Sequence, residues 1–434
     1  MNPNIKTPIF LEYFNQGSDR LFFFKDSIVR YLKESFHIKH YQLENYKRIK
    51  LVALFLLPIH FIFCNKNKLI INWNIICELS PRRYNNNFFI KLLAFLLWEF
   101  RFLHFKLVVF FIKPTFFLCT DSAFFLLRWM EHCKKKNIIV LRDFNNDSYS
   151  FSIIREKDNE LRFNNNFHQN PSEINPQKLS EFENEFQIRL KGESNNLDYV
   201  LAHNINNNQV KIFSNKIRVL LAAHIFGDAS SAHISMFKTF KEWTLFFIQL
   251  FSNKTDDYLL IVKEHPSSRI YNEENMLLNL LGNSSFASNI IFIPANTQIS
   301  QENIDIVITG NGSIGHEYIY LNKPVLNTSI GFCINYKGCY TVKNKEQIFD
   351  FFHDKNNIIK LQNDVINNRD FNLKMLYIFT KCSNLLNNDE FKIAIESKDY
   401  DRLKYFFEKS KINDFIFNPD NQNHYFVLEP KHIS

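Results

Sequence analysis

The second half of the chain alternates short apolar runs with helical segments, and this alternation limits the folds open to it. Apolar runs of four to eight residues between polar loops are typical of strands buried on both faces of a parallel sheet. The predicted strands are Ile217–Ala223, Tyr258–Val262, Ile290–Ile293, Ile304–Ile308 and Pro324–Asn327, and the predicted helices are Ser235–Phe251, Glu273–Leu281 and about Ile314 to Leu321. This order predicts an α/β unit with a parallel sheet, the nucleotide-binding half of a doubly wound fold.

The first half shows the same alternation less clearly. Its predicted buried strands are Leu51–Leu56, Leu69–Ile71, Leu107–Ile112 and Ile138–Leu141, and Ser122–Lys135 is predicted to be a helix. Polar residues dominate from Arg142 to Asn215, which we interpret as irregular structure and a linker. A chain of 434 residues has enough apolar material for two cores. The predicted parts are an N-terminal Rossmann-like acceptor domain over 1–210, a C-terminal nucleotide-sugar-binding domain over 216–370 and a helical tail over 371–434.

Charge and cysteine content narrow the classes of partner and compartment. The formal net charge of +8 favours an anionic partner, and without a nucleic-acid-binding motif we expect a nucleotide phosphate or a membrane surface rather than nucleic acid. The seven cysteines are irregularly spaced and form no CxxC pair, so neither a disulfide framework nor a zinc site is predicted. The N-terminal residues lack the layout of a signal peptide. We therefore expect a cytoplasmic protein.

Two apolar segments in the first half raise the question of a membrane. Leu51 to about Asn65 lacks formal charge but is too short to span a bilayer. The segment Phe88–Cys119 is interrupted by charged side chains, namely Lys91, Glu99, Arg101, Lys106 and Lys113. Two interpretations stay open: a buried helix followed by the buried strand Leu107–Ile112, or a basic amphipathic surface lying peripherally on the inner membrane.

The most informative segment is Thr309–Asn327, TGNGSIGHEYIYLNKPVLN, which follows a predicted buried strand and opens a helix. It contains Gly310, Gly312 and Gly315. Such glycines let a ligand approach the backbone closely, and Ser313 can cap the helix, whose N-terminus is suited to a phosphate. Glu317, one turn into the helix, could accept hydrogen bonds from ribose hydroxyls. A glycine-rich turn can also simply join a strand to a helix, so this segment alone does not decide the function.

A second polar loop, Lys263–Arg269 or KEHPSSR, follows the strand Tyr258–Val262. His265 could donate a hydrogen bond to a phosphate oxygen or to a leaving group, and Pro266 would restrict the loop that presents it. Lys263 and Arg269 add positive charge. An ordinary surface turn with a solvated histidine is the alternative.

A third loop, Ala222–Asp228 or AAHIFGD, also follows a predicted strand. His224 and Asp228 could face the interdomain cleft, although the aspartate could instead cap the next helix. The carboxyl ends of parallel strands share one edge of a sheet, where ligands bind in open α/β folds. We therefore expect the three loops to converge on a single pocket.

These residues resemble a known family. The span from about Arg218 to Asn327, a quarter of the chain, is similar to the C-terminal domain of bacterial capsule polysaccharide biosynthesis transferases in VLLAAHIFGD, Glu242-Trp243, VKEHP and the glycine-rich segment. The His-Pro pair resembles the motif with which GT-B sialyl- and Kdo-transferases contact the donor phosphate. The SxGxE…KP pattern resembles the nucleotide loop of GT-B enzymes and of UDP-sugar epimerases. The resemblance implies a GT-B fold, in which two Rossmann-like domains face a cleft.

The resemblance also implies roles for single residues: Ser313 and Gly315 would bind phosphate, Glu317 ribose, and His265 phosphate or the leaving group. The predicted catalytic residues are His265, Asp228, His224 and Asp143. The predicted donor-binding residues are Lys263, Glu264, Pro266, Arg269, Asn311, Gly312, Ser313, Gly315, Glu317 and Lys323.

The catalytic base and a metal are separate questions. In related GT-B enzymes the base comes from the N-terminal domain, where Asp143 and Asp147 follow a predicted strand, although both could simply form a turn. The Asp-x-Asp motif at Asp399 and Asp401 falls in a predicted solvated helix. We therefore predict no metal, with helix dipoles, histidine and lysine stabilising charge instead.

The sequence as a whole predicts a metal-independent glycosyltransferase without a cofactor. It would move a sugar from a nucleotide sugar, linked to CMP, UDP or GDP, to a polysaccharide or lipid-linked acceptor of capsule or lipopolysaccharide. Three alternatives stay open: a CDP-glycerol-type glycerophosphotransferase, a nucleotide-sugar epimerase, and a non-catalytic scaffold of a capsule assembly complex.

Overall fold

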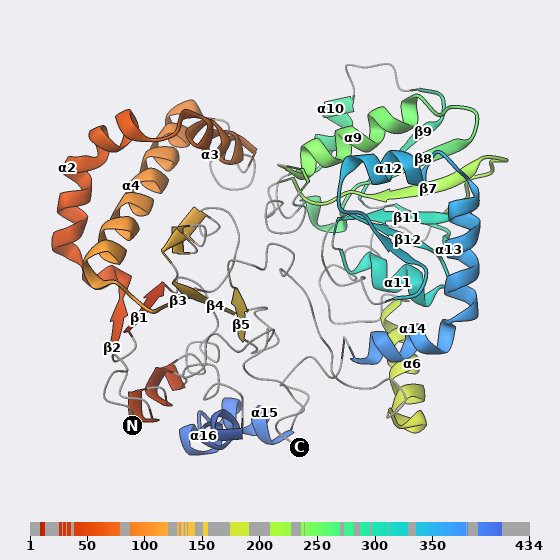
Figure 1. The fold of residues 1–434 in the computed structure, drawn as a ribbon. Coiled ribbons are helices and arrows are strands. Elements are labelled where there is room, and N and C mark those ends of the chain that lie inside the picture. Colours follow the sequence, from red (N-terminus) through yellow and green to blue (C-terminus); the bar gives the residue numbers. More distant parts are fainter. Residues whose placement is uncertain are drawn as a thin grey trace. The chain divides into compact units, whose positions relative to one another are not determined.

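The structure is a computed structural model that describes most of the chain. The described residues are 9–13, 26–35 except 28 and 32, 39–78, 87–119, 128–143 except 130, 131, 134 and 137, 151–154, 174–190, 209–226, 236–269 except 238, 273–281, 287–310 except 296, 312–328, 336–380 except 379, and 389–409. The chain divides into two compact units (Figure 1). The first is Met1–Trp73, Leu92–Gln169 and Phe379–Ser434, and the second is Asn74–Lys91 and Asn170–Ile378.

The second unit is built on a six-stranded parallel sheet in the order β13-β12-β11-β7-β8-β9. The strands are β7 (Ile217–Ala222), β8 (Tyr258–Lys263), β9 (Ile290–Ile293), β11 (Ile306–Thr309), β12 (Val325–Asn327) and β13 (Cys339–Thr341). The chain winds outward in one direction from β7 to β9 and in the other from β11 to β13. The order therefore reverses between β7 and β11, which is the switch point of a doubly wound sheet.

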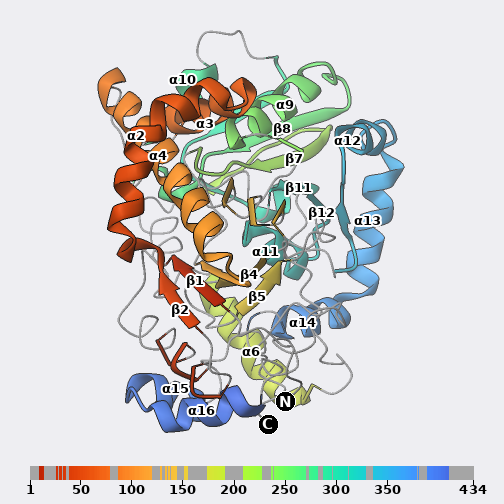
Figure 2. The same cartoon turned by 60° about the vertical axis from the view of Figure 1, so that its left-hand side comes forward.

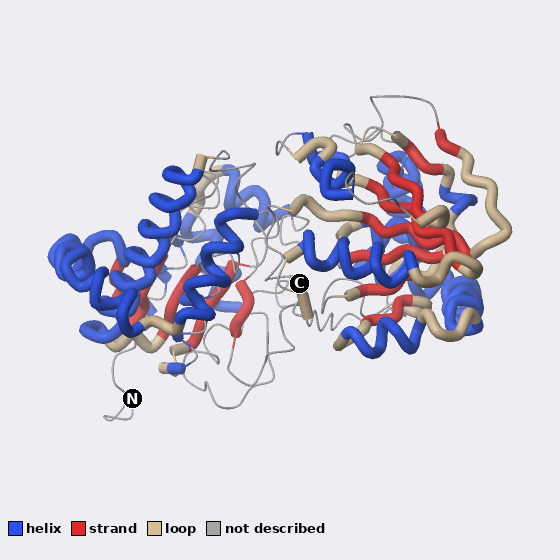
Figure 3. The backbone as a smooth tube through the Cα atoms, turned by 90° about the horizontal axis from the view of Figure 1, so that it is seen from above, coloured by secondary structure: helices blue, strands red, loops and turns tan. Residues whose placement is uncertain are grey.

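Helices cover both faces of this sheet, as the view in Figure 3 shows. They are α6 (Pro176–Leu190), α9 (Phe240–Ser252), α10 (Met276–Leu281), α11 (Ile314–Tyr320), α12 (Lys345–Phe351), α13 (Asn356–Asn367) and α14 (Arg369–Tyr377), and a small separate sheet pairs β6 (Gln209–Val210) with β10 (Gln298–Ile299). Neighbouring strand residues such as Val219 and Leu220 point to opposite faces, yet both are buried. Burial on both faces explains why these strands read as continuous apolar runs.

The core between the sheet and α9 is rich in aromatic side chains. Trp243, Phe247 and Phe251 of α9 are fully buried and pack with Tyr258 at the start of β8. The helix begins at Phe240 because the Thr239 side chain accepts a hydrogen bond from the Glu242 N–H at 3.0 Å. Burying one such aromatic side chain stabilises a fold by about 2–3 kcal/mol, so α9 is firmly held against the strands that carry the loops described below.

The first unit has a five-stranded sheet in the order β2-β1-β3-β4-β5, parallel except for the β4–β5 pair. Its strands are β1 (Ile9–Tyr13), β2 (Lys39–Gln42), β3 (Phe116–Cys119), β4 (Ile139–Asp143) and β5 (Phe151–Ile154). Its helices are α2 (Lys47–Phe63), the first part of α3 (Lys66–Glu78), most of α4 (Phe88–Ile112), α15 (Asp389–Glu396) and α16 (Tyr400–Lys409), with the short 3₁₀ turn η1 (Leu43–Asn45). The end of α3 from Asn74 and the start of α4 up to Lys91 belong to the second unit. Phe105 and Val109 of α4 pack against Leu11 of β1 and Phe117 of β3. The predicted α/β class with two Rossmann-like sheets is confirmed.

Several predicted strands of the first unit are wrong. Leu51–Leu56 lies in α2, Leu69–Ile71 in α3 and Leu107–Ile112 in α4. Each run is part of a longer segment with apolar side chains on every face, so its periodicity does not distinguish a buried strand from a helix. Ile138–Leu141 does contain most of β4, as predicted. Among the described helices no single one is long and apolar enough to cross a membrane, whereas α2 and Lys66–Asn74 of α3 meet the criterion together but are bent by 113°.

The boundaries of the units differ from the predicted ones. The residues of α6 fall in the stretch interpreted as irregular structure within the predicted domain 1–210, but they form a helix of the second unit, where the ring of Phe182 meets that of Tyr377 of α14. The helices α15 and α16 belong to the first unit, and the Tyr400 hydroxyl donates to Glu34 at 2.9 Å. The expected helical tail is therefore shared between the two units.

Gly338 permits a tight turn before β13, and we expect Gly338→Ala to destabilise the second unit. Its φ is +81°, and an added Cβ would lie 1.9 Å from the Val365 side chain and 2.9 Å from the Leu361 carbonyl oxygen. Steric overlap and unfavourable φ together should cost about 2 kcal/mol or more, lowering Tm by about 4–8 °C. Lys360→Ala on exposed α13 serves as the control. An unchanged Tm for the glycine variant would contradict the turn geometry.

Candidate active site

The loops after β7, β8 and β11 meet at the switch point of the second sheet. The His224 and His265 rings have centroids 6.4 Å apart and lie within 26° of parallel. A Cβ placed on Gly312 would lie 3.5 Å from Nε2 of His224. His224 is thus next to both other loops, so the three loops form one cluster at the sheet edge where ligands bind in folds of this class.

His224 is oriented by the first turn of α9. Its ring stacks on that of Phe240 with centroids 4.1 Å apart and planes 10° apart, and Trp243 meets it edge-on at 6.1 Å. The ring is half-buried. The β7 loop continues the sheet for one more residue, because the Ala223 N–H donates to the Lys263 carbonyl at 3.0 Å. The imidazole therefore has one fixed face and one edge turned toward Gly312.

One ring nitrogen of His265 is hydrogen-bonded to the backbone of its own loop. The Ser267 N–H donates to Nδ1 at 3.1 Å, at the start of the 3₁₀ turn η4 (Pro266–Arg269). Because Nδ1 accepts this hydrogen bond, the proton of the neutral imidazole lies on Nε2. Nε2 is then a donor suited to an anionic oxygen, as the His-Pro motif predicts.

Glu273 ties two of the three loops together. It is buried, and its Oε2 accepts a hydrogen bond from the Phe226 N–H in the β7 loop at 2.6 Å. Its own N–H donates to the Ser268 carbonyl in η4 at 2.8 Å. A charge-assisted bond of this kind is stronger than a neutral one. The sequence did not indicate this residue, because a glutamate at the start of a predicted helix looks like an ordinary first-turn charge.

The glycine-rich loop is anchored by buried hydroxyl groups. The Gly312 N–H donates to Thr309 Oγ1 at 2.9 Å. The Thr309 carbonyl accepts from the Thr328 N–H at 3.0 Å and from its hydroxyl at 3.2 Å, and Thr328 Oγ1 accepts from the Trp243 indole at 2.8 Å. The loop is therefore connected through two threonines to the same helix that orients His224.

The start of α11 differs from the expectation in one respect. Ser313 stands at the N-cap, but its backbone is already helical and its hydroxyl makes no capping hydrogen bond. The prediction that Ser313 caps the helix is wrong. Its side chain is exposed beside Gly312, Gly315 is buried, and Glu317 is half-buried in the first turn. The nearby His316 Nδ1 is hydrogen-bonded to the Tyr336 hydroxyl at 2.8 Å.

Lys263 and Glu264 are directed toward the end of β9. The Lys263 ammonium donates to the carbonyls of Glu264, Pro294 and Ala295 at 3.1, 2.9 and 2.8 Å, and burial lowers the pKa of Lys263 to about 8. Glu264 is buried and accepts from the Ala295 N–H at 3.2 Å, and burial raises its pKa. All three Lys263 donors are used on backbone carbonyls, so its hydrogen bonds tie the end of β8 to the end of β9. Pro266 begins η4, and Arg269 is exposed at its end.

Lys323 does not belong to the cluster. It lies two residues before β12 and so at the amino edge of the sheet, opposite the three loops. At that edge Arg218 and Asp305 form an ion pair at 2.8 Å. Burial raises the pKa of Asp305, but hydrogen bonds from Arg218 and the positive charges of Arg218 and Lys323 have a larger effect. The pKa of Asp305 is therefore lowered. A strand separates Lys323 from any ligand at the carboxyl edge. The predicted donor-binding role of Lys323 is therefore not supported.

The remaining predicted residues lie either outside the described part of the chain or in the first unit. Asp228, Asn311 and Asp147 lie outside the described residues, and Asp143 is the last residue of β4 in the first unit. Asp399 accepts from the Arg402 N–H at 3.1 Å and so caps α16. Within the described ranges, one group could supply three metal ligands, His60, Cys64 and Glu99 of the first unit. Arg128 donates to both Glu99 and Cys64, so its guanidinium occupies the place of a cation.

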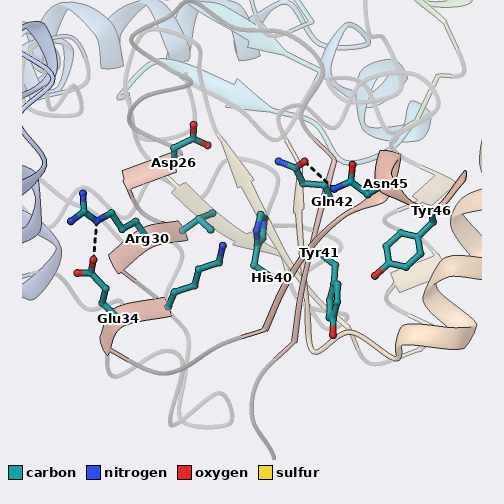
Figure 4. A pocket seen from close by; sticks show the side chains of 10 residues that line it. Asp26, Arg30, Glu34, His40, Tyr41, Gln42, Asn45 and Tyr46 are labelled. Carbon is teal, nitrogen blue, oxygen red and sulfur yellow. Dashed lines mark hydrogen bonds and ion pairs between the residues drawn. The ribbon is translucent and has the colours of Figure 1, made fainter.

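The first unit has a polar pocket beside the edge strand β2, with a volume of about 840 Å³. His40 and Tyr41 of β2 are among its lining residues, and Figure 4 shows Arg30 and Glu34 paired on one side of His40 and Gln42 and Asn45 on the other. Arg30 Nε donates to Glu34 at 2.8 Å. Carboxylate, amide and phenol groups of this kind can hydrogen-bond a ligand rich in hydroxyls.

Comparison with known proteins gives likeness only to solved structures. No protein-family profile and no curated protein matches the sequence. Thermosulfurimonas dismutans KpsC, a beta Kdo 2,7 transferase, is similar at 11% identity with a TM-score of 0.34, over 78% of this chain and 84% of its own. Methanocaldococcus jannaschii UDP-GlcNAc 2-epimerase, in complex with UDP-GlcNAc and UDP, is similar at 13% identity with a TM-score of 0.27, over 87% and 99%. Anabaena Alr3699/HepE, in complex with UDP-glucose, is similar at 10% identity with a TM-score of 0.29, over 90% and 100%.

These neighbours are sugar transferases and UDP-sugar enzymes. Two Rossmann-like α/β units in one chain are the composition of the GT-B fold that the sequence resemblance implies. Because the identities are low and the TM-scores lie below 0.5, no residue role is transferred from them to this chain.

The first expected outcome concerns Gly312 at the switch point. A Cβ there would lie 3.2 Å from Thr309 Oγ1 and would fill the space beside His224. We expect Gly312→Ala to weaken nucleotide binding by about tenfold, the effect of losing a close backbone approach, with little change in Tm. Lys323→Ala at the other end of α11 is the matched control and should leave the calorimetric Kd unchanged. Equal Kd values for both variants would argue against binding at this loop.

A second outcome separates a structural from a ligand-binding role for Lys263. We expect Lys263→Met to lower Tm, because three buried carbonyls lose their donor, while the Kd for nucleotide stays within about threefold. Between pH 8 and 10.5 the unfolded state binds more protons than the folded state, so this lysine makes stability rise with pH. The free energy of unfolding of the wild type minus that of the variant, measured by denaturant titration, should therefore increase between pH 8 and 10.5. Lys211→Met, at an exposed lysine, is the control. If Lys263→Met abolished nucleotide binding without changing Tm, Lys263 would have a ligand-binding role instead.

Proposed function

We propose that this chain is a glycosyltransferase that transfers a sugar from a nucleotide-sugar donor bound at the β7–β11 switch point. The observation that carries the proposal is the position of His224, which lies next to both His265 and Gly312. Two imidazoles and a glycine-rich loop thus share the edge where an open α/β sheet binds phosphates.

The chemistry asked of this cluster is stabilisation of a leaving phosphate. As the glycosidic bond breaks, negative charge grows on the oxygen that links the sugar to the nucleotide. Hydrogen-bond donors fixed before the reaction stabilise such charge without reorganising. Nε2–H of His265 is assigned as the principal donor, because the Ser267 N–H holds Nδ1. His224 and the exposed Ser313 hydroxyl would contact the adjacent phosphate oxygens.

The positions of other polar groups suggest which of them bind the ribose of the donor and which bind the acceptor. Glu317, one turn into α11, is proposed to accept hydrogen bonds from the ribose hydroxyls. The polar pocket beside β2 is proposed as the acceptor site, because its carboxylate, amide and tyrosine groups suit a saccharide. Asp143 at the end of β4 stays the proposed base, since a base must reach the acceptor hydroxyl.

The pathway is proposed from the sequence resemblance. The His-Pro and SxGxE…KP motifs support a place in the assembly of capsule or lipopolysaccharide on the cytoplasmic side, with a CMP-linked sugar as the first donor to test. Metal independence is proposed on the same ground, with the two histidines supplying the charge stabilisation.

Three His265 variants test the proposal. His265→Ala should lower kcat by about 100-fold, the scale of losing one fixed donor. His265→Asn can still accept from the Ser267 N–H but lacks a donor at the Nε2 position, and should be equally slow. His265→Gln places an amide N–H near the Nε2 position and should recover part of the rate. Undiminished turnover in the alanine variant would remove His265 from the mechanism.

A donor screen separates this function from its rivals. Thermal shifts with CMP, UDP, GDP and CDP should identify one nucleotide that raises Tm, because a ligand of the native state stabilises it. Radiolabelled sugar from that donor should then appear in polysaccharide or lipid. Turnover of CDP-glycerol alone would indicate a glycerophosphotransferase, donor conversion without an acceptor an epimerase, and no nucleotide binding a non-catalytic scaffold.

A further inference from the structure

The first unit has a second cavity whose charged lining residues are all basic, whereas the pocket beside β2 is lined by both acidic and basic residues. It has a volume of about 530 Å³ and lies between α2, the start of α3, α4 and the side chains of Arg128, His132 and Lys135. Lys68, Lys106, Arg128 and Lys135 are among its lining side chains, and none of the lining residues that the structure describes is acidic. The rest of the wall is largely apolar, from Leu56, Ile59, Phe63, Phe102 and Leu103.

The floor of this cavity is a buried, neutralised network. Glu99 is fully buried and accepts from Asn72 at 2.6 Å, from Arg128 at 2.5 Å and contacts His60 Nε2 at 2.8 Å. Burial raises the pKa of Glu99, but the bond to His60 and the charge of Arg128 outweigh it and lower the pKa. Glu99 therefore carries a charge that cancels that of Arg128. The excess positive charge comes from the three lysines.

The pKa of His132, which lines this cavity, indicates a positive electrostatic potential there. Burial is the first cause that lowers the pKa of His132 to about 4, and the charges of Lys106, Lys136 and Lys135 lower it further. A neutral imidazole next to several ammonium groups can donate to an anion without adding charge of its own. The cavity therefore suits a phosphate or carboxylate ligand.

The apolar wall continues onto an exposed helix surface. Of the 25 large hydrophobic side chains found exposed in the described part of the chain, 16 lie on α2, α3 and α4. On α2, Phe55 is 80%, Ile62 75% and Phe63 84% exposed, and Phe63 also lines the cavity. Helices α2 and α4 lie side by side in both Figure 1 and Figure 2. Exposed apolar patches of this extent mark interaction sites.

Charge around the patch indicates what covers it. The apolar stretch of α2 has Lys47, Arg48 and Lys50 before it, and Lys66 and Lys68 follow at the start of α3. An apolar helix face bordered by basic residues is the pattern of segments that lie in the plane of an anionic bilayer. A protein partner would need acidic groups around an apolar core, whereas an anionic phospholipid offers both features in one molecule.

We propose that the α2–α4 surface binds an anionic membrane, with the cavity holding the phosphate headgroup of one phospholipid. The apolar side chains of α2 and α4 would enter the headgroup and acyl boundary. Lys106, Lys135 and Arg128 would contact the phosphate, and Phe63 the adjoining chain. This site is separate from the nucleotide cluster of the second unit, so its test does not depend on transferase activity.

Vesicle flotation with the full-length chain tests the proposal. Vesicles of phosphatidylcholine containing a minority of phosphatidylglycerol should carry the protein, and pure phosphatidylcholine vesicles should carry much less. Lys106→Gln with Lys135→Gln should reduce the bound fraction about tenfold or more. Lys211→Gln with Lys360→Gln removes the same charge from the second unit and should leave binding unchanged. Equal losses in both double variants would reduce the effect to net charge and overturn the site.

A matched pair tests the apolar contribution. Phe63→Ser and Phe213→Ser remove side chains that are 84% and 87% exposed in the first and second units. The first should weaken vesicle binding by about tenfold and the second should not. Both variants should keep the wild-type Tm, since neither side chain is buried. Unaltered vesicle binding in Phe63→Ser would contradict insertion of this face.

A soluble headgroup distinguishes the two sources of phosphate. Glycerol 3-phosphate should compete only weakly with vesicles, because it lacks the acyl chains that contact Phe63. Tight calorimetric binding of glycerol 3-phosphate that is lost in the lysine double variant, without any vesicle binding, would show a site for a free phosphate and overturn the membrane proposal. Equal binding to neutral and anionic vesicles would overturn the headgroup assignment.

Discussion

The stacking of His224 on Phe240 is the contact on which the arrangement of the candidate site depends. It brings the end of β7 against the first turn of α9, with ring centroids 4.1 Å apart. Without this contact the β7 loop would lack the surface that turns the imidazole toward Gly312 and His265. Trp243 in the same helix then reaches the β11 loop through Thr328. One buried helix thus fixes two loops that are far apart in sequence.

Polar groups buried below the cluster hold it more rigidly than surface loops are usually held. Thr309, Thr328 and Glu273 are nearly or fully buried, and each is hydrogen-bonded to the backbone or side chain of another loop. Removing one partner from such a network leaves a buried polar group unsatisfied, at a cost of about 1–3 kcal/mol. The proposed function requires such support, because donors that are fixed before a phosphate binds can stabilise a leaving group without reorganising.

The secondary structure could be predicted from the sequence where a segment had a clear pattern of apolar and polar residues. In the second unit, runs such as Ile217–Ala223 and Tyr258–Val262 are short, apolar and bounded by polar loops, and they matched β7 and β8 to within one residue. In the first unit, Leu107–Ile112 is only the end of a 25-residue apolar helix, and β2 is a polar edge strand. Neither shows a periodicity that separates strand from helix.

The same limits apply to the site. The edge shared by His224, His265 and Gly312 followed from strand order, because parallel strands end together. The roles of Glu273, Thr309 and Thr328 did not, since their partners lie in other loops and only the fold brings them together. The charge of Lys263 and Lys323 suggested a phosphate, whereas the structure shows Lys263 hydrogen-bonded to three carbonyls and Lys323 at the far edge of the sheet.

The most direct measurement is an NMR titration of the chain carrying labelled histidine, with CMP, UDP, GDP and CDP each tried as the ligand. The ring signals of His224 and His265, assigned by substitution, should shift together with one Kd, because the proposed site places both rings against the same nucleotide phosphate. The exposed His353 of the second unit should stay unmoved and serve as the reference. If the two rings responded with different Kd values, or if neither responded, the three loops would not form a single phosphate site.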